Sequence, residues 1–334
     1  MRRFTAKNFT LQSGTTVPEL HIAFEIYGEL NANRDNLVVF PTYYTGRQTS
    51  NAPYFAAGRA LDPARHCILV PCLIGNSESS SPSNTDGAFA GANFPKVTLH
   101  DNVRLQRALV NAVCPVEQIA LVTGWSMGGC QAFEWAAQCG DGVARALPFC
   151  ATAKCSTHNH VFLEGVKAAL TADQDWHGGH YDAPPEKGLR AFGRAYAGWA
   201  YSSTYFDKAL YSQRGFKDVD ALLSDWEEDH LSWDANDLLC KLWTWQHADI
   251  SANARFSGDL STALRSITAK MIVMPSQTDM YFNAENSAAD SAQIPNAEFR
   301  PFPSAWGHCA ATPSAPDPAF FAFFDQAIED LMAR

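Results

Sequence analysis

Short runs of consecutive apolar residues recur in the first and last thirds of the chain, and they predict β-strands. A continuous rather than alternating apolar run is typical of a strand that is covered on both faces of a sheet. The runs lie at residues 20–27, 36–40, 67–71, 119–123, 145–150, 270–275 and 297–302. Residues 98–112 instead carry Leu99, Val103, Leu105 and Leu109 near helical spacing. This order predicts an α/β fold with a mostly parallel sheet flanked by helices.

The middle of the chain has a different character. Residues 155–262 lack strand-like runs and contain six of the nine tryptophans, whereas residues 318–332 form the pattern of a closing amphipathic helix. We therefore expect a core domain made of residues 1–154 and 263–334, interrupted by a helical lid, or cap, domain at residues 155–262.

Composition excludes several classes of protein. Hydrophobic residues make up 46% and charged residues 18% of the 334 positions, which is ordinary for a globular protein and unlike a disordered one. The net charge is −10, and no Lys/Arg run is longer than Arg2-Arg3, so we expect no nucleic-acid partner. No apolar window approaches the length of a spanning helix, so we expect no membrane association.

The cysteines and the N-terminus predict where the protein resides. The nine cysteines are odd in number, form no Cys-x-x-Cys pair and in part lie within apolar runs. Buried thiols in a reducing compartment fit this pattern better than a disulfide framework. The N-terminus has positive charge but no apolar segment of a signal peptide behind it. The sequence predicts a soluble, cytoplasmic protein.

The clearest chemical signal is a nucleophile elbow around Ser126. The segment Gly124-Trp-Ser-Met-Gly128 follows a predicted strand and precedes a helical pattern. Small residues are needed at Gly124 and Gly128, because the turn is sharp and the two backbones pass close to each other. We predict that Ser126 is a catalytic nucleophile rather than a passive serine in a glycine-rich turn.

A serine nucleophile needs a general base and an acid that orients it. In this arrangement the chain order is Ser, acid, His. His308 follows the last predicted strand and is the candidate base, and Asp279 follows the strand at residues 270–275 and is the candidate acid. Asp290 and Asp317 compete with Asp279, but one falls in an Ala-rich helical stretch and the other in a Pro-rich turn.

Acyl transfer also needs backbone N–H donors for the oxyanion. One is expected from Met127, the residue after the nucleophile, and the second from the loop after the strand at residues 36–40. In that loop the donor is Tyr44 or its neighbour Tyr43.

Other motifs predict no cofactor and no metal. The histidine pairs at residues 158–160 and 177–180 have no companion Cys or carboxylate at a metal-site spacing, and we interpret them as polar residues flanking helices. The glycines near residues 75–91 form no G-x-G-x-x-G after a strand, so nucleotide binding of that kind is not supported.

Several longer segments resemble the homoserine O-acetyltransferase family within the α/β-hydrolase fold. They are Tyr27–Ala32, Phe94–Thr98, Ser126–Gly129 with Glu134-Trp135, and Asp175-Trp176 with Gly179–Tyr181. The resemblance implies a Ser126/Asp279/His308 triad, an acyl-enzyme on Ser126, a helical lid and a homodimer built through that lid.

Three departures from the family pattern bear on the substrate. Cys309 follows His308 at the position where the resemblance implies an Asp that anchors the ammonium group of homoserine. A neutral thiol cannot form an ion pair with an amine. Lys167 stands where the resemblance implies an Arg that holds the homoserine carboxylate, and it loses the bidentate fork. Trp125 replaces the usual Gly beside the serine, so it either narrows the acyl pocket or simply packs.

These departures favour a serine esterase that hydrolyses short-chain, acetyl-type esters, with Trp125 and Lys167 as candidate substrate-binding residues. The alternative is an O-acetyltransferase that moves acetyl from acetyl-CoA to homoserine or another alcohol. A third hypothesis, a catalytically silent protein that kept the fold, is disfavoured because the candidate triad is intact.

Overall fold

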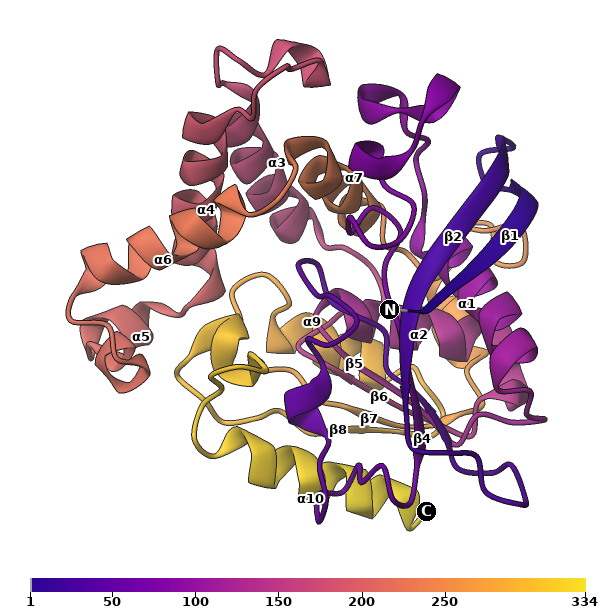
Figure 1. Cartoon of the computed structure of the whole chain (residues 1–334). Coiled ribbons are helices and arrows are strands. Elements are labelled where there is room, and N and C mark those ends of the chain that lie inside the picture. Colours follow the sequence, from indigo (N-terminus) through magenta and orange to yellow (C-terminus); the bar gives the residue numbers. More distant parts are fainter. Residues whose placement is uncertain (1) are drawn as a thin grey trace.

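The computed structural model describes residues 2–334, and an eight-stranded sheet runs through their centre (Figure 1). The strand order is β1-β2-β4-β3-β5-β6-β7-β8, and every neighbouring pair from β4 onward is parallel. The strands are β1 (Arg2–Thr10), β2 (Thr16–Tyr27), β3 (Leu37–Val39), β4 (Cys67–Pro71), β5 (Leu121–Trp125), β6 (Arg145–Phe149), β7 (Lys270–Val273) and β8 (Ala297–Phe299). The predicted α/β fold is therefore confirmed.

The helices cover both faces of the sheet, and some of them lie beyond it (Figure 1). They are α1 (Leu99–Val113), α2 (Met127–Cys139), α3 (Thr157–Thr171), α4 (Glu186–Ala200), α5 (Ser203–Asp207), α6 (Val219–Leu231), α7 (Ala235–Gln246), α8 (Leu260–Arg265), α9 (Ala284–Ser291) and α10 (Phe320–Met332). Two hydrophobic clusters cover the two faces of the sheet. Leu37 and Val39 of β3 pack into one of them, and the intervening Val38 packs into the other, because side chains alternate across a strand.

The first strand was not expected from the sequence. β1 pairs antiparallel with β2, and β2 pairs antiparallel with β4, so one edge of the sheet is antiparallel. None of the side chains of β1 is fully buried, because β1 is an edge strand with one neighbour. It therefore lacks the continuous apolar run by which the inner strands were predicted.

Helices α3, α4, α6 and α7 form a group above the sheet (Figure 1). Their aromatic residues Phe162, Phe192 and Trp245 belong to a hydrophobic cluster that also includes Met127 and Tyr281, so these helices pack against the loops at the end of the sheet. The boundary predicted between residues 262 and 263 falls inside α8, whose Ala263 and Leu264 pack into a cluster of the sheet. The division into a core domain and a lid domain at residues 155–262 stays a prediction.

Two further sequence-based expectations concern the whole chain. Among residues 2–334, no helix is both long enough and apolar enough to cross a membrane. The nine cysteines are all free thiols, and seven of them are buried.

Candidate active site

Ser126 lies at the sharp turn between β5 and α2. Its backbone angles, φ 57° and ψ −128°, fall where non-glycine residues are strained, and such strain concentrates at functional sites. A Cβ on Gly124 would lie 2.3 Å from the carbonyl carbon of Gly128, and one on Gly128 would lie 2.5 Å from the carbonyl oxygen of Pro41. The turn therefore requires both glycines, as the sequence predicts.

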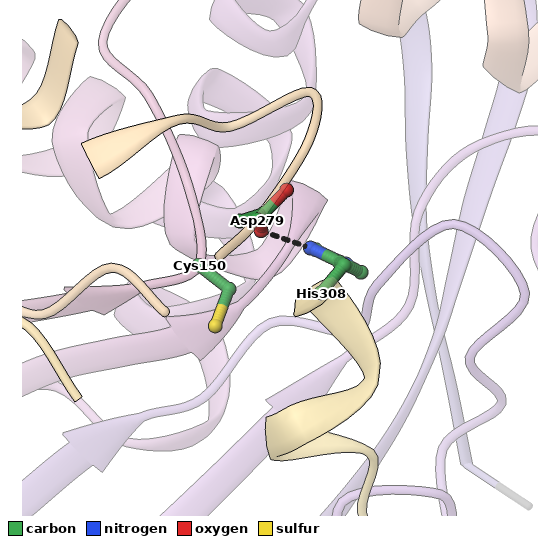
Figure 2. A group of neighbouring side chains, drawn as sticks. All are labelled: Cys150, Asp279 and His308. Atoms are coloured by element: carbon green, nitrogen blue, oxygen red, sulfur yellow. Dashed lines mark hydrogen bonds and ion pairs between the residues drawn. The ribbon is translucent and has the colours of Figure 1, made fainter. Parts of the chain in front are cut away.

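His308 and Asp279 form a buried hydrogen-bonded pair. Nδ1 of His308 donates to Oδ2 of Asp279 over 2.6 Å (Figure 2). The other carboxylate oxygen accepts hydrogen bonds from the backbone N–H groups of Tyr281 at 3.1 Å and Phe282 at 3.0 Å. The carboxylate is thus held by three donors. Because Nδ1 is bonded to Asp279, Nε2 is the ring nitrogen left to act as a base.

The two competing carboxylates lie elsewhere. Asp317 accepts a hydrogen bond of 2.7 Å from the hydroxyl of Ser304, and Asp290 lies on α9, where burial raises its pKa to about 6. Neither makes a hydrogen bond to His308, so the structure brings together the pair preferred from the sequence.

Ser126 and His308 both line a cavity of about 220 Å³. Its walls are rich in aromatic residues and come from segments far apart in the chain. The aromatic residues that line it are Tyr43, Tyr44, Trp125, Tyr196, Tyr201, Trp226 and Tyr281. We call this space the Ser126 cavity.

The candidate oxyanion donors lie next to Ser126 in the chain or line the Ser126 cavity. Tyr43 and Tyr44 line the Ser126 cavity, and Met127 is the first residue of α2. Within residues 2–334, the backbone N–H groups of these three residues donate to no protein acceptor. They are therefore available to a ligand, and the structure leaves the choice between Tyr43 and Tyr44 open.

The two candidate substrate-binding residues differ in their location. Trp125 lines the Ser126 cavity and its ring stacks on that of His308, with centroids 5.0 Å apart. Lys167 does not line this cavity. It lies on α3, is half-exposed and pairs with Glu164 over 3.1 Å. The expected contact between Lys167 and the substrate is not supported by this position, because Lys167 lines a different cavity, together with Lys96 and Trp243.

Charged residues that the sequence analysis missed line the same cavity. Arg214 comes from a short helical turn at Leu210–Arg214, and Asp225 and Asp229 lie one turn apart on α6. Arg214 contacts the hydroxyl of Tyr201, while its Nε is buried without a hydrogen-bond partner among the described residues. In the sequence, these charged residues are indicated only by the spacing of Asp225 and Asp229, and such spacing is common on exposed helices.

The phenols and thiols around the cavity stay protonated at neutral pH. Burial raises the pKa of Tyr43 to about 12 and the pKa of Tyr281 well above its usual value. Burial also raises the pKa of the Cys309 thiol. These groups are therefore neutral, and Cys309 is not a thiolate nucleophile.

Cys150, at the end of β6, lies against the Asp279–His308 pair (Figure 2). The potential ligand atoms of the three side chains lie within 4.8 Å of one another. A metal would need the thiolate, but burial and the charge of Asp279 raise the pKa of Cys150 well above its usual value. This environment favours a neutral thiol packed against an acid–base pair over a metal site.

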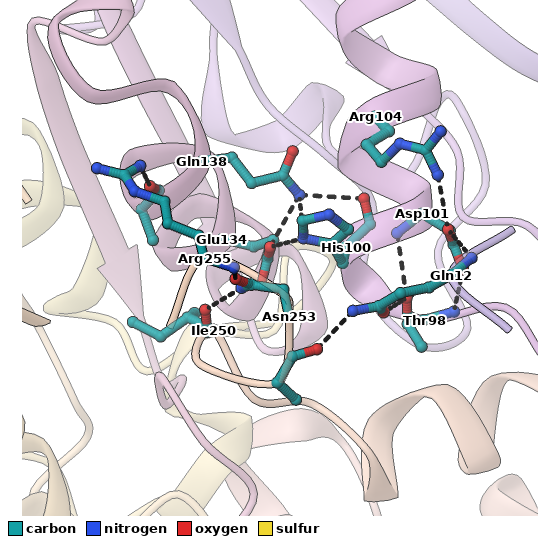
Figure 3. Close-up of polar contacts among 12 residues, drawn as sticks. Gln12, Thr98, His100, Asp101, Arg104, Glu134, Gln138, Ile250, Asn253 and Arg255 are labelled. Atoms are coloured by element: carbon teal, nitrogen blue, oxygen red, sulfur yellow. Dashed lines mark hydrogen bonds and ion pairs between the residues drawn. The ribbon is translucent and has the colours of Figure 1, made fainter. Parts of the chain in front are cut away.

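A polar network anchors the far end of α2, the helix that follows Ser126. Oε1 of the buried Glu134 accepts hydrogen bonds from Nδ1 of His100 at 2.9 Å and from Nε2 of Gln138 at 2.8 Å (Figure 3). Arg255 of a distant loop donates to the carbonyl of Ala137 at 3.0 Å. These bonds tie α2 to α1 and to the loop, and they hold the helix on which the elbow depends.

Comparisons with known proteins add the family context. No family model matches the chain. The chain is 36% identical over 304 residues to an ethyl acetate hydrolase of Pseudomonas veronii, and the match covers 89% of this chain and 86% of the relative. It is 30% identical over 313 residues to a homoserine O-acetyltransferase of Chloroherpeton thalassium, covering 90% of this chain and 82% of the relative.

A solved structure agrees with these relatives. The acetyl esterase MekB superposes on this chain with a TM-score of 0.96 and 32% identity, covering 100% of this chain and 96% of the other. The similarity therefore extends over the sheet and over the helices inserted between β6 and β7.

Proposed function

From the premise that this chain belongs to the homoserine O-acetyltransferase-like family of α/β hydrolases, we propose that it is an acetyl esterase whose catalytic triad is Ser126, Asp279 and His308. The observation that carries the triad is the 2.6 Å bond between His308 and Asp279 beside the cavity that contains Ser126. The relatives of this chain include an ethyl acetate hydrolase and an acetyl esterase, and this similarity supports small acetyl esters as substrates.

In the first half-reaction, Oγ of Ser126 attacks the carbonyl carbon of the ester while Nε2 of His308 takes the hydroxyl proton. Asp279 keeps Nδ1 protonated and stabilises the imidazolium. The carbon–oxygen bond to the alcohol then breaks, and His308 returns the proton to the leaving alkoxide. In the second half-reaction, His308 activates a water that attacks the acyl-enzyme, which releases acetate and restores Ser126.

The negative charge of each tetrahedral intermediate needs preorganised donors. We assign these to the N–H of Met127 and to the N–H of Tyr44 or Tyr43, none of which donates to an acceptor in the described part of the chain. The N-terminus of α2 adds its positive dipole end at the same place.

The size of the cavity supports a short acyl chain. Pockets for drug-sized ligands hold about 300–1,000 Å³, whereas the Ser126 cavity holds about 220 Å³. Trp125 and Tyr43 pack edge to face with centroids 4.6 Å apart and form one wall. A small ester fits this space better than a long-chain one.

Helices α4 and α6 supply lining residues such as Tyr196 and Trp226, and we propose that residues 155–262 act as a lid over the cavity. The homodimer through this lid, which the family resemblance implies, stays a prediction. Light scattering on the purified protein measures its mass and tests that prediction.

The function is tested by following the acetyl group of p-nitrophenyl acetate while L-homoserine is titrated. We expect acetate as the product at every homoserine concentration, because the thiol of Cys309 cannot hold an ammonium group and Lys167 lies outside the cavity. O-Acetylhomoserine that increases with homoserine would instead establish the transferase alternative. A Ser126→Ala variant serves as the control for hydrolysis that does not use the triad.

A further inference from the structure

Trp125 is in direct contact with the proposed base. The indole ring of Trp125 and the imidazole of His308 are stacked, with centroids 5.0 Å apart and an angle of 23° between the ring planes. Trp125 is 7% exposed, and the edge-to-face contact with Tyr43 holds it from another side. Its place in the chain, directly before Ser126, ties this ring to the strand that carries the nucleophile.

Trp125 contacts the face of the imidazole, whereas Asp279 contacts its edge. Asp279 bonds Nδ1 and so sets the direction of one ring nitrogen. The remaining soft motion of the ring is rotation about its Cβ–Cγ bond, and contacts with the faces of the ring limit this rotation. The rings of Tyr281 and Phe282 also approach His308, with centroids 4.5 Å and 5.5 Å away, but they are tilted by 42° and 53°. Trp125 makes the most nearly parallel of these contacts.

The contact changes in strength when a proton moves. A cation attracts the face of an aromatic ring, tryptophan offers the strongest such face, and the attraction grows when water is excluded. Both rings are almost fully buried, so the imidazolium gains more from the stack than the neutral imidazole does. An interaction that strengthens as the reaction proceeds accelerates the chemical step.

Other groups near His308 titrate outside the neutral range or lie across the cavity. Tyr281 lies two residues after Asp279, Cys150 directly follows β6, and Cys309 directly follows His308; burial raises the pKa of all three. From the inserted segment, the charged residues Arg214, Asp225 and Asp229 face the cavity, together with His230, whose pKa is lowered by burial. An uncharged substitution at Trp125 therefore removes the stack on His308 and leaves every charge near His308 in place.

We propose that Trp125 is a positioning residue, which holds the plane of the His308 ring and stabilises the imidazolium formed when Nε2 accepts the proton of Ser126. In that step the Oγ–H bond breaks, a bond forms between Oγ and the carbonyl carbon, and the carbonyl electron pair moves to the oxygen. This role rests on the proposed esterase function. It differs from a role for Trp125 as a wall of the acyl pocket, which would affect acyl selectivity alone.

The experiment compares Trp125→Phe and Trp125→Leu with the wild type in p-nitrophenyl acetate hydrolysis across the pH range. We expect Trp125→Leu to lower kcat by roughly threefold to thirtyfold, and Trp125→Phe to lower it less. The acidic limb of the pH–rate profile moves to lower pH in the Leu variant, because the imidazolium loses a stabilising contact. A rate that falls equally at all pH values, or a change confined to the ratio of acetate to butyrate hydrolysis, would overturn the proposal.

The chain offers a matched control. Trp243 stacks on His247 with centroids 4.0 Å apart and an angle of 19°, at a place that does not line the Ser126 cavity. Trp243→Leu removes the same kind of stack, and we expect it to leave the pH–rate profile unchanged. Thermal unfolding of all variants identifies any loss of rate that comes from loss of the fold, and Trp125→Phe retains an aromatic ring if the Leu variant does not fold.

A second readout does not depend on ester hydrolysis. A fluorophosphonate reacts with an activated serine: the Oγ–P bond forms, fluoride leaves and His308 takes the proton. If Ser126 is labelled but no ester is hydrolysed, the proposed function fails while the role of Trp125 is still measured by the pH dependence of labelling. If labelling by the Leu variant shows the wild-type pH dependence and rate, the inference about Trp125 fails by itself.

Discussion

The carboxylate of Asp279 accepts a 2.6 Å hydrogen bond from Nδ1 of His308, although 29 residues separate them in the chain. The bond is almost fully shielded from water, since the two side chains are 0% and 4% exposed. A histidine held in this way has a fixed orientation, so it can act as a base toward a single proton donor.

Removing members of the proposed triad should therefore abolish most of the activity. We expect Ser126→Ala to lower kcat by about 10³-fold or more, and Asp279→Asn by roughly 10³- to 10⁴-fold, because the amide leaves His308 in the wrong tautomer. Steady-state hydrolysis of p-nitrophenyl acetate measures both. Asp317→Asn is the matched control, since Asp317 bonds Ser304 and not His308, and an equal loss in that variant would contradict the assignment of Asp279.

The elbow should not tolerate a methyl group. Gly128→Ala would place a Cβ 2.5 Å from the carbonyl oxygen of Pro41, so the strand or α2 must shift. We expect the variant to lose activity and to unfold with a lower free energy. The loss in the free energy of unfolding is several kcal/mol if the backbone stays in place, and roughly 1–3 kcal/mol if it relaxes. Urea unfolding followed by circular dichroism measures this.

A helical glycine with open space around it provides the comparison. Gly165 lies in α3, and a Cβ added there would meet no atom within 4 Å. Gly165→Ala should raise the free energy of unfolding by about 0.5–1 kcal/mol, because alanine has the higher helix propensity. Destabilisation at Gly165 as large as at Gly128 would show that the elbow is not special.

A buried lysine should make the protein less stable at low pH. Lys241 is fully buried on α7, its Nζ has no hydrogen-bond partner among the described residues and lies 3.7 Å from the centroid of the Trp233 ring. Burial lowers its pKa to about 7, against about 10.4 in an unfolded chain. Between about pH 7 and about pH 10 the unfolded chain binds a proton that the folded chain does not, so this group makes stability rise with pH.

Lys241→Met should remove that dependence. We expect the variant to unfold with a free energy about 1–4 kcal/mol higher than the wild type at pH 6 to 7, and with little difference near pH 10. Urea unfolding across this pH range provides the measurement. Lys217→Met is the control, because the Lys217 side chain is 82% exposed and its loss should change stability by less than about 0.5 kcal/mol. A difference that does not vary with pH would contradict the prediction.

Lys167, which the sequence predicts to bind substrate, and Arg214, which lines the Ser126 cavity, should behave differently when substituted. Lys167→Met removes only the exposed pair with Glu164, so KM should stay within about twofold of the wild type. Arg214→Met removes a charged donor from the Ser126 cavity and should raise KM by roughly tenfold for an ester with a polar alcohol part. Kinetics on such an ester and on ethyl acetate measure both, and the reverse order of effects would return Lys167 to the binding site.

The local features of this protein followed from its sequence because their causes are local. The inner strands carry continuous apolar runs, the run at 67–71 coincides with β4, and the elbow depends on glycines two residues from Ser126. Steric contact within a turn involves neighbours in the chain, so the residue types alone indicate it. The edge strand β1 escaped prediction because its side chains lack the apolar run of a covered strand.

Only the tertiary structure decided which side chains meet. It brought Asp279 rather than Asp317 to His308, placed Lys167 outside the cavity and Arg214 within it, and stacked Trp125 on the imidazole. These contacts depend on how the strands, their loops and the inserted helices pack together. The sequence by itself indicated the fold class, the candidate nucleophile and, from their order along the chain, the candidate acid and base. Long-range packing alone decided the walls of the cavity and the ring stacked on His308, because no local rule relates residues that are distant in the chain.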